Sequence, residues 1–410
     1  MTEGSIVFAR EPLISYTGPL GFVQILETPI LNLLGFATLV ATNASRMAKA
    51  IYPKKCVEFG IRRAQGPDGG FSASSYAFLG GFEGTSNMKA SQIYNLPCMG
   101  TMSHAFITSF VSLEEIDEFE INNIPIKKRS LEIRKQLNFE THDGELAAFL
   151  AYAKAFSNNF KTLIDTYSTL ESGILNTIIV SKALSEAGIN EYGIRLDSGD
   201  LCELSKQCRA IWNKYVPQLH FTIFASDDLH EDRLIEMEAQ GSQIDVYAIG
   251  THIATCKKQP ALGLVCKLTE INKAPRMKFS SDPEKATLPC NKAIYRVWTD
   301  KNEKASFDLI TLEEENFRLG ENKIYTLSKE VEQVHNIVKM TRLNEYLDIS
   351  KFTKTLLENK SNVRTSMRDL PDEIFNLSKP AKHEIMMSEK FLESFERVRK
   401  ANELHKQKLE

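Results

Sequence analysis

The sequence lacks a strong net charge, any close pairing of cysteines and an uninterrupted apolar run. Its 410 residues carry a formal net charge of −3 and contain only two tryptophans. A chain so close to neutral gives no reason to expect nucleic acid or an anionic membrane as a partner. Any anionic ligand must therefore be bound by a local cluster of side chains.

The seven cysteines are odd in number and form no C-x-x-C pair. This pattern argues against a disulfide framework, and the spacing gives little support to the alternative of zinc ligation. We expect reduced thiols and a cytoplasmic (cytosolic) location, because the N-terminus also lacks the basic-then-apolar order of a secretory signal. The most apolar region, residues 18–44, is interrupted by Glu27, Pro29 and Asn32 and favours a buried helix pair over a membrane span.

From about residue 54, apolar runs of strand length alternate with segments of helix length. Such alternation predicts a parallel sheet with right-handed crossovers. Nearly every run ends in polar or glycine-rich residues, which favours a β/α barrel with functional residues at the carboxyl ends of its strands. An open, doubly wound sheet remains the alternative. The predicted strands are residues 56–60, 77–81, 96–99, 162–164, 192–194, 221–224 and 244–249.

The regions on either side of this alternation predict a second, smaller domain that is split around the barrel. Residues 5–8 and 13–17 resemble strands without upstream partners, and isolated strand pairs are only marginally stable. Residues 266–271, 276–280 and 293–298 alternate like antiparallel strands and are their natural partners. The predicted division is 1–50, 51–265, 266–345 and a helical, charged region at 346–410.

The stretch from Gly100 to Phe106 follows a predicted buried strand and presents Thr101, Ser103 and His104 within four positions. Two hydroxyl groups and an imidazole at a strand end form a plausible catalytic cluster. A structural histidine among apolar neighbours is the alternative interpretation.

A second cluster is formed by Arg195, Asp197 and Asp200, directly after another predicted strand. An arginine at this edge can bind a carboxylate with two hydrogen bonds. The two aspartates could bind sugar hydroxyls or a magnesium ion, which prefers oxygen ligands. An internally neutralised ion-pair network is the alternative, and Asp165 with Thr166 extends the cluster more weakly.

Two further strand ends suit phosphate. Gly250 and Thr251 offer backbone N–H groups and a hydroxyl, although a simple turn has the same sequence. Arg62 adjoins another strand end, where its guanidinium could bind phosphate or form a surface ion pair. Together the strand ends predict a site for an anionic, phosphate-bearing sugar, with one candidate nucleophilic histidine.

These motifs resemble the nicotinate phosphoribosyltransferase family, in order and at family-like spacing, from about Glu3 to Trp298. The resemblance rests on Gly60-Ile61-Arg62-Arg63-Ala64-Gln65-Gly66-Pro67-Asp68-Gly69, Gly80-Gly81-Phe82, Thr85-Ser86-Asn87, Gly100-Thr101 with His104, Arg195-Leu196-Asp197-Ser198-Gly199-Asp200, Gly250-Thr251, Asp282-Pro283-Glu284-Lys285 and Thr287-Leu288-Pro289.

The resemblance implies an α/β fold, with an irregular TIM-like barrel beside a split open-faced sandwich domain. It implies a homodimer with shared active sites that forms nicotinate mononucleotide and pyrophosphate from nicotinate and phosphoribosyl pyrophosphate. It also implies ATP as a co-substrate and a requirement for Mg²⁺ (or Mn²⁺).

Residue by residue, His104 matches the family's transiently phosphorylated histidine, and Thr101 and Arg195 match positions that bind nicotinate. Thr251 matches a residue at the 5-phosphoribosyl group, and Arg62 an arginine facing the phosphates. The remaining predicted site residues are Ser103 and Gly250 for substrate binding and Asp197 and Asp200 for catalysis.

The sequence also departs from the family. Nothing before Met1 supplies the family's Leu-Tyr-Gln motif, whose tyrosine stacks on the pyridine ring across the dimer, so we expect a truncated gene product or an incomplete site. Slight differences occur at Ser226-Asp227-Asp228 and at His252, after the predicted phosphate loop. A nicotinamide phosphoribosyltransferase and an inactive, dimerising relative are the alternatives.

Overall fold

The computed structural model describes residues 1–279, 287–299, 303–317, 323–326, 331–332, 337–344 and 355–407. Within it the chain forms two compact units, one of residues 37–260 and one of residues 1–36 with 261–410. Each unit is described by itself, and the predicted four-part division stays a prediction. The predicted turn at Asp282-Pro283 lies outside the described residues.

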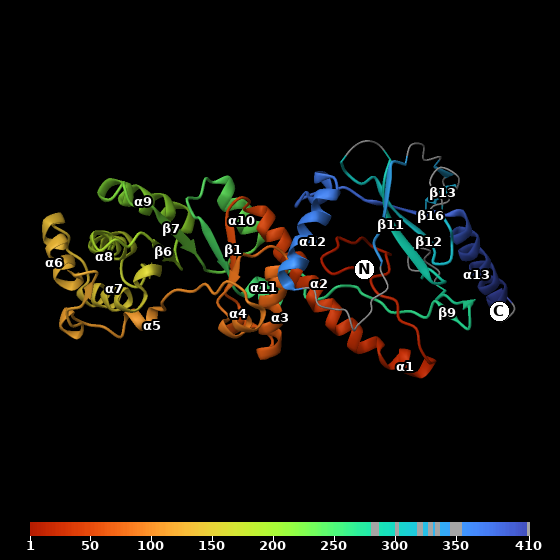
Figure 1. Ribbon diagram of the computed structural model, residues 1–410, viewed down its shortest axis with the longest axis horizontal. Helices are drawn as coiled ribbons and strands as arrows, with labels where there is room; N and C mark the ends of the chain where they lie inside the picture. Colours follow the sequence, from red (N-terminus) through yellow and green to blue (C-terminus); the bar gives the residue numbers. More distant parts are fainter. Residues whose placement is uncertain are drawn as a thin grey trace. The chain divides into compact units, whose positions relative to one another are not determined.

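The unit of residues 37–260 is built on a six-stranded parallel sheet in the order β2-β1-β8-β7-β6-β5 (Figure 1). All strand pairs of this sheet are parallel, which confirms the predicted sheet. The short strands β3 (Glu120–Ile121) and β4 (Ile124–Pro125) form a separate antiparallel pair. Among the described residues β2 and β5 form the two edges, so backbone hydrogen bonds do not close the ring. The strands are β1 (Lys55–Glu58), β2 (Gly84–Thr85), β5 (Phe160–Leu163), β6 (Tyr192–Leu196), β7 (Phe221–Ala225) and β8 (Val246–Ile249).

Helices connect these strands where the periodicity predicts them. One of these helices is α7, whose first turn is capped by His142, the Nδ1 of which accepts a hydrogen bond from the backbone N–H of Glu145. The helix α10 buries Leu234 and Met237, as its pattern predicts. The helices of this unit are the second half of α2 (Glu27–Ala50), α3 (Gly66–Leu79), α4 (Met88–Tyr94), α5 (His104–Ile107), α6 (Ile126–Leu137), α7 (Asp143–Phe156), α8 (Ile174–Glu186), α9 (Leu201–Tyr215), α10 (Glu231–Ala239) and α11 (Thr251–Thr255).

Two predicted strands of this unit are wrong. Residues 77–79 form the last turn of α3, which begins with Pro67 in its first turn and buries small side chains such as Ala73 and Ala77. Residues 96–99 form only an isolated bridge, between Cys98 and Thr85. The preceding Pro97 has no N–H to donate to a strand partner, which limits pairing.

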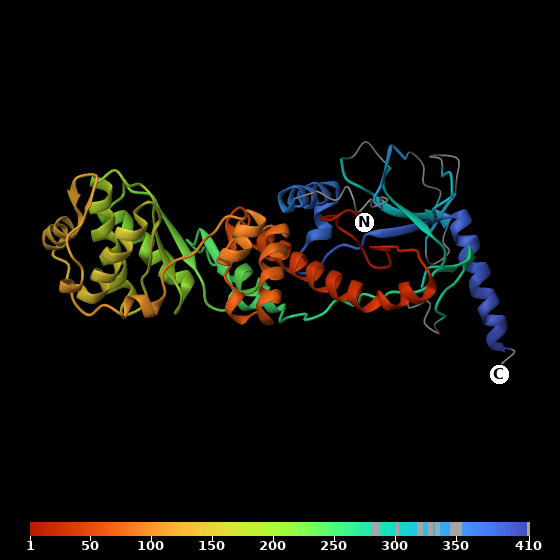
Figure 2. The ribbon, with the colours of Figure 1, turned by 60° about the horizontal axis from the view of Figure 1, so that its bottom comes forward.

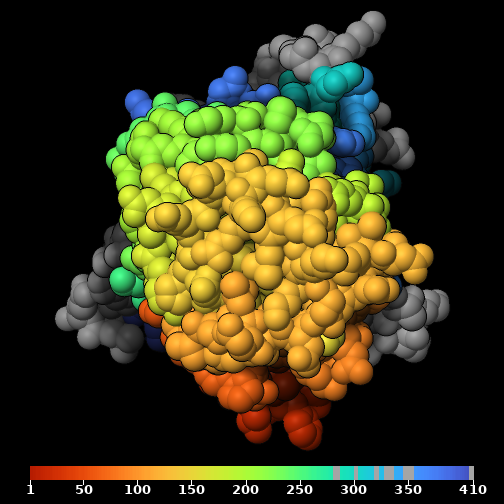
Figure 3. All heavy atoms as spheres, turned by 90° about the vertical axis from the view of Figure 1, so that its left-hand side faces the viewer, coloured from red at the N-terminus to blue at the C-terminus, as the bar shows by residue number. Residues whose placement is uncertain are grey.

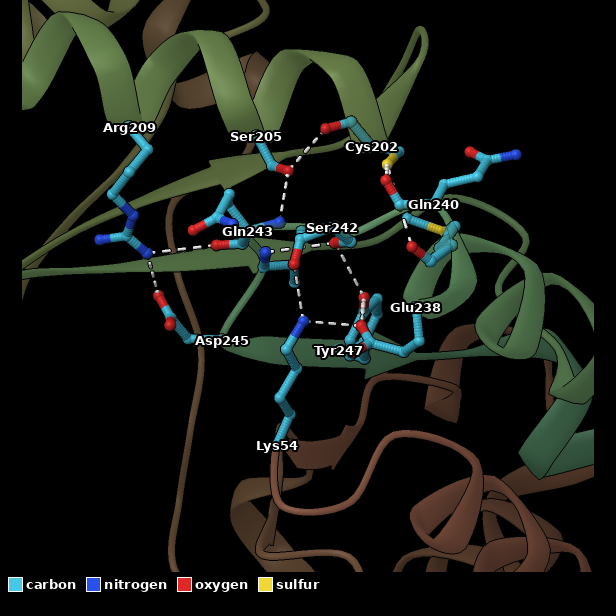
Figure 4. A network of polar contacts seen from close by, with 12 residues as sticks. Lys54, Cys202, Ser205, Arg209, Glu238, Gln240, Ser242, Gln243, Asp245 and Tyr247 are labelled. Carbon is cyan, nitrogen blue, oxygen red and sulfur yellow. Dashed lines mark hydrogen bonds and ion pairs between the residues drawn. The ribbon is translucent and has the colours of Figure 1, made fainter.

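The amino ends of the central strands are held by a polar network (Figure 4). Lys54, directly before β1, donates hydrogen bonds to Glu238 and to the carbonyl oxygen of Ser242, at 2.7 and 2.8 Å. Arg209 of α9 pairs with Asp245, directly before β8, at 2.7 Å. These contacts fix the strand register at the edge opposite the predicted site, where side chains of barrel-like folds contribute to stability.

The other unit contains a mixed six-stranded sheet in the order β14-β13-β16-β12-β11-β15. Its two faces bury alternate side chains, as strand geometry requires. Ile385 and Met387 of β16 pack on one face with Phe391 of α13, and Met386 packs on the other. From there α13 runs on toward the C-terminus (Figure 2). The elements are β11 (Lys292–Trp298), β12 (Phe307–Leu312), β13 (Ile324–Thr326), β14 (Val331–Glu332), β15 (Lys339–Arg342), β16 (Glu384–Ser388), α12 (Leu356–Asp369) and α13 (Glu389–Gln407).

The predicted strands of this unit are confirmed only at β11. Residues 5–8 and 13–17 form no strand, and residues 276–279 form none either. The run at 266–271 contributes only β9 (Glu270–Ile271), which pairs with β10 (Ala274–Pro275). The strand β16 lies in the region predicted to be helical.

The N-terminal segment packs on the sheet through side chains instead of pairing with it. Phe8 stacks on His383 with ring centroids 4.2 Å apart, and Arg296 donates to the carbonyl oxygen of Ile6 at 2.9 Å. Arg296 also forms a buried, two-bond ion pair with Asp308. The guanidinium of Arg296 thus binds the N-terminal segment through the carbonyl oxygen of Ile6, without a ladder of backbone hydrogen bonds.

The apolar stretch before residue 50 is helical, but its first half is not buried as predicted. It forms α1 (Leu20–Ile25) and α2, and Phe22, Ile25 and Leu33 are all more than two-thirds exposed. By length and composition, the stretch Leu20–Ala50 could cross a membrane, although core helices and signal sequences meet the same criterion. Its burial begins at Leu39, inside the unit of residues 37–260.

Candidate active site

His104 is the first residue of α5, at the carboxyl edge of the parallel sheet. Ser103 caps this helix, its Oγ accepting a hydrogen bond from the N–H of Phe106 at 3.3 Å. The Nδ1 of His104 lies 3.0 Å from Oγ1 of Thr166, which follows β5. Its side chain is 43% exposed. The ring is therefore fixed on one side and open to a ligand.

Two carboxylates face the other nitrogen of this ring. The Nε2 of His104 lies 3.6 Å from Oδ2 of Asp197 and 3.9 Å from Oδ1 of Asp165. Asp165 is 2% exposed, and its Oδ2 accepts hydrogen bonds from the N–H of Asp197 and the hydroxyl of Ser198. Its Oδ1 has no hydrogen-bond partner. Asp197 in turn accepts a hydrogen bond from Ser226. The ends of β5, β6 and β7 are thus joined around the histidine.

Arg195 brings a positive charge to the same edge from β6. Its side chain is 12% exposed and lies 4.0 Å from the carboxylate of Asp197. Burial lowers the pKa of Arg195 and the positive charge of Arg62 lowers it further, while Asp197 and Asp165 raise it. The Nε of Arg195 is buried without a partner. A largely buried guanidinium with an unused donor is suited to an incoming carboxylate.

The carboxyl ends of β1 and β8 approach each other closely. A Cβ on Gly60 would lie 2.5 Å from the carbonyl oxygen of Gly250 and 2.6 Å from the Cβ of Ala254. Only glycine allows this approach. It brings Arg62, exposed in the turn after β1, and Thr251, the first residue of α11, to adjacent strand ends.

Glu58 organises these ends, and sequence reasoning missed it. It is 1% exposed at the end of β1. Its carboxylate accepts hydrogen bonds from the N–H of Gly60, from Ser74 at 2.9 Å and from Thr85 at 2.6 Å. A glutamate inside an otherwise apolar strand is the sequence signal that could have identified it.

Two predicted residues make other contacts. Asp200 is exposed and caps α9, its Oδ1 accepting a hydrogen bond from the N–H of Glu203 at 3.0 Å. The hydroxyl of Thr101 donates to the carbonyl oxygen of Met102 at 3.3 Å. The residues that the structure describes contain no group of three or more histidine, cysteine, aspartate or glutamate side chains that could hold a metal ion.

An open hollow of about 680 Å³ borders the loop after β5, but none of the predicted site residues lines it. It lies between that loop and the segment from α6 to α7, on the end of the unit that Figure 3 shows. His142 and Tyr167 stack at its wall with ring centroids 3.7 Å apart. The clustered charges at His104, and not this hollow, mark the candidate active site.

Comparison with known proteins assigns the chain to one family. The model of the nicotinate phosphoribosyltransferase (NAPRTase) family matches residues 54–310, more than half of the chain. The chain belongs to this family. It is 42% identical over 356 residues to the nicotinate phosphoribosyltransferase of Dictyostelium discoideum, a match that covers 84% of the chain and 60% of that relative. The Homo sapiens relative is 34% identical, with 95% and 77% covered.

A solved structure of a relative agrees with this assignment. The crystal structure of the human nicotinic acid phosphoribosyltransferase superposes with a TM-score of 0.81 at 30% identity, covering 96% of this chain and 81% of that one. This confirms the predicted fold class. A nicotinate-nucleotide pyrophosphorylase from Pyrococcus furiosus shares the fold, with a TM-score of 0.57 at 18% identity. The chain spans about 60% of the length of several of its curated relatives.

Proposed function

We propose that the protein is a nicotinate phosphoribosyltransferase that couples transfer to ATP hydrolysis through a phosphohistidine at His104. Nicotinate and phosphoribosyl pyrophosphate are its substrates, and nicotinate mononucleotide and pyrophosphate its products. The observation that carries the proposal is the position of His104, hydrogen-bonded at Nδ1 and facing Asp165 and Asp197 beside the buried Arg195. Its relatives bear the name of this activity.

The histidine can act as a nucleophile in one tautomer. If Nδ1–H donates to Thr166, the lone pair of Nε2 is free to attack the γ-phosphorus of ATP. A P–N bond forms, the bond from phosphorus to the bridging oxygen breaks, and ADP leaves with that oxygen. Water later attacks the phosphohistidine, which restores the imidazole and releases phosphate.

In the transfer step the pyridine nitrogen of nicotinate attacks C1 of the ribose and pyrophosphate leaves. Arg195 would hold the nicotinate carboxylate, with Thr101 and Ser103 in the adjoining stretch. Arg62, Gly250 and Thr251 would face the phosphate groups. Asp197 would stabilise the positive charge that develops on the ribosyl group.

The described residues do not form a cage for Mg²⁺ or Mn²⁺. Asp200, one of the two aspartates predicted to bind sugar hydroxyls or magnesium, accepts a hydrogen bond from the N–H of Glu203 through Oδ1. We therefore infer that a divalent cation would bind together with the substrate, coordinated by its phosphate groups, as magnesium often is.

The proposal includes a homodimer with shared active sites and a cytosolic location. All seven cysteines are free thiols, which supports a reducing compartment. The deciding experiment is incubation of the chain with γ-³²P-ATP, followed by product analysis with nicotinate and with nicotinamide. Acid-labile label and a product from nicotinate alone are expected. Absence of label would refute the phosphohistidine, and a product from nicotinamide would refute the assigned substrate.

A further inference from the structure

Glu145 is a fully buried acid that the proposed chemistry does not use. It lies in the first turn of α7 with 0% exposure. Its Oε2 accepts hydrogen bonds from the hydroxyl of Ser172 at 2.5 Å and from the amide of Asn176 at 3.0 Å. Its Oε1 is buried without a partner, and so is Oδ1 of Asn176. A buried acceptor without a donor is costly, so packing alone does not explain a carboxyl group at this position.

The contacts of Glu145 end on the loop that positions His104. This loop, residues 164–173, supplies Asp165 and Thr166 at its start and Ser172 at its end. Its two ends touch, because a Cβ on Gly173 would lie 2.1 Å from the carbonyl oxygen of Ile164. A shift of Ser172 is therefore passed directly to the residues that face the histidine.

The amino end of α7 is held to the same loop. Ser172 accepts a hydrogen bond from the N–H of His142 at 3.1 Å, and Asn176 donates to the carbonyl oxygen of His142 at 3.3 Å. Glu145, Ser172 and Asn176 thus form one buried network between α7, the loop and α8. The network has a single ionisable member, the carboxyl group of Glu145.

The surroundings of Glu145 favour its protonated form. Burial raises the pKa of Glu145 to about 7, and the negative charge of Asp165 raises it, while the hydrogen bonds from Ser172 and Asn176 lower it. The nearby His142 caps the same helix, and its Nδ1 accepts the hydrogen bond from the backbone N–H of Glu145. Ser172 also lines the open hollow, which gives the buried carboxyl group a route for proton exchange with solvent.

The charged groups on the elements packed around this network are few. Arg134 of α6 pairs with Asp143 at the start of α7 at 2.5 Å, which neutralises both. On the loop side Asp165 is a buried acid, and Glu171 is exposed. A change in the charge of Glu145 is therefore felt at Asp165, whose Oδ1 faces the Nε2 of His104.

We propose that Glu145 is a positioning residue for His104, acting through the loop of residues 164–173 and through the charge state of its own carboxyl group. The proposal rests on the proposed role of His104 as the phosphate acceptor. Above neutrality the ionised Glu145 strengthens the hydrogen bonds from Ser172 and Asn176 and favours a protonated imidazole by its charge. Below neutrality the carboxyl group of Glu145 is protonated, and its lack of charge makes it similar to the amide of a glutamine.

The first test measures the imidazole of His104 directly. The full chain, labelled with ¹⁵N-histidine, is titrated by NMR between about pH 5.5 and pH 9, and H104A assigns the signal. We expect the imidazole signals of E145Q to reach those of the neutral ring at a lower pH than in wild type, because a negative charge has been removed. The control is E171Q, the same substitution on an exposed residue of the same loop. Equal midpoints in wild type, E145Q and E171Q would overturn the proposal.

The second test measures phosphorylation of His104 from γ-³²P-ATP against pH. E145Q is expected to take up more label than wild type near neutrality, because its imidazole loses its proton at a lower pH and Nε2 is then free to attack, whereas E171Q follows wild type throughout. Parallel profiles for E145Q and wild type would contradict the proposal. If wild type takes no label, the proposed phosphohistidine is wrong, and the NMR titration still decides the role of Glu145.

A second variant keeps the test valid if E145Q does not fold, as judged by circular dichroism. S172A removes the donor to Oε2 and should raise the pKa of Glu145, so the midpoint of His104 should fall as in E145Q. An unchanged midpoint in folded S172A would also count against a positioning role.

Discussion

The guanidinium of Arg195 donates a hydrogen bond of 3.2 Å to the carbonyl oxygen of Met102, two residues before His104. This bond joins β6 to the segment that carries the candidate phosphate acceptor, over 93 residues of sequence. The residue proposed to bind the substrate carboxylate therefore also holds the segment on which the histidine is presented. One side chain thus joins the two roles proposed for this edge, binding of the substrate carboxylate and acceptance of the phosphoryl group.

Replacing Arg195 should impair nicotinate binding first. We expect R195K to raise the KM for nicotinate at least about tenfold, since lysine lacks the planar fork that pairs with a carboxylate. The KM for ATP should change much less. Steady-state kinetics with each substrate varied in turn measures both, and an equal rise in the two constants would contradict the assignment of the carboxylate contact.

Replacing His104 should abolish acid-labile labelling by γ-³²P-ATP. The only group proposed to carry the phosphoryl group is then gone, so H104A should retain no label above background. The matched control is H220A, at an exposed histidine directly before β7. Label that survives in H104A would place the phosphoryl group on another residue.

Replacing Thr166 tests the orientation of the histidine. T166V keeps the shape of the side chain but removes the partner of Nδ1 at 3.0 Å. We expect the rate of phosphorylation to fall roughly tenfold. Such a change raises the activation free energy by about 1.4 kcal/mol, the usual contribution of one hydrogen bond. Binding of nicotinate should be unaffected. Single-turnover labelling measures the rate, and wild-type kinetics would show that the tautomer is set elsewhere.

Replacing Gly60 tests the approach of β1 to β8. G60A puts a Cβ 2.5 Å from the carbonyl oxygen of Gly250, so the strand ends must separate. Thermal unfolding should show a destabilisation of roughly 1–3 kcal/mol, the usual cost of overpacking. In the control G69A the new Cβ meets its nearest atom at an ordinary 3.7 Å, and its melting temperature should not fall. Equal melting temperatures for G60A and wild type would show that the ends relax freely.

The buried acid Glu11 should make stability depend on pH. Burial and the neighbouring Asp308 raise the pKa of Glu11 to about 9, against a usual value near 4.5. The folded chain therefore binds a proton that the unfolded chain loses, and this stabilisation is complete below pH 4.5 and is lost as the pH rises through about 9. E11Q removes this dependence.

Urea unfolding at pH 6 and pH 9 measures it, with the pH values chosen to lie below and at the raised pKa of Glu11. The free energy of unfolding of E11Q relative to wild type should increase from the lower to the higher pH. The exposed Glu373 provides the control E373Q, for which no such change is expected. A constant difference between E11Q and wild type would mean that Glu11 is already ionised in the folded state.

The sequence by itself determined the local features of the fold and the members of its charged edge. Apolar runs of strand length, alternating with segments of helix length, predict β6, β7 and β8 with the helices between them, because the strands of a covered parallel sheet are buried along their length. The polar residues that follow a parallel strand meet at one edge, so His104, Arg195 and Asp197 could be grouped before any contact was known. The same motifs carry the resemblance to the family.

Tertiary structure decided how those residues are held. The network around Glu145 and the acceptor role of Glu58 depend on side chains from distant segments, and no local pattern encodes such contacts. Asp200 looked equivalent to Asp197 in sequence, but Asp200 caps α9 through the N–H of Glu203, whereas Asp197 faces His104. The residues near Ile6 looked like a strand, yet the fork of Arg296 takes the carbonyl oxygen that a strand partner would have used. Periodicity determines which face of an element is buried. The partner of a polar group is determined only by tertiary contacts between segments that are distant in the sequence.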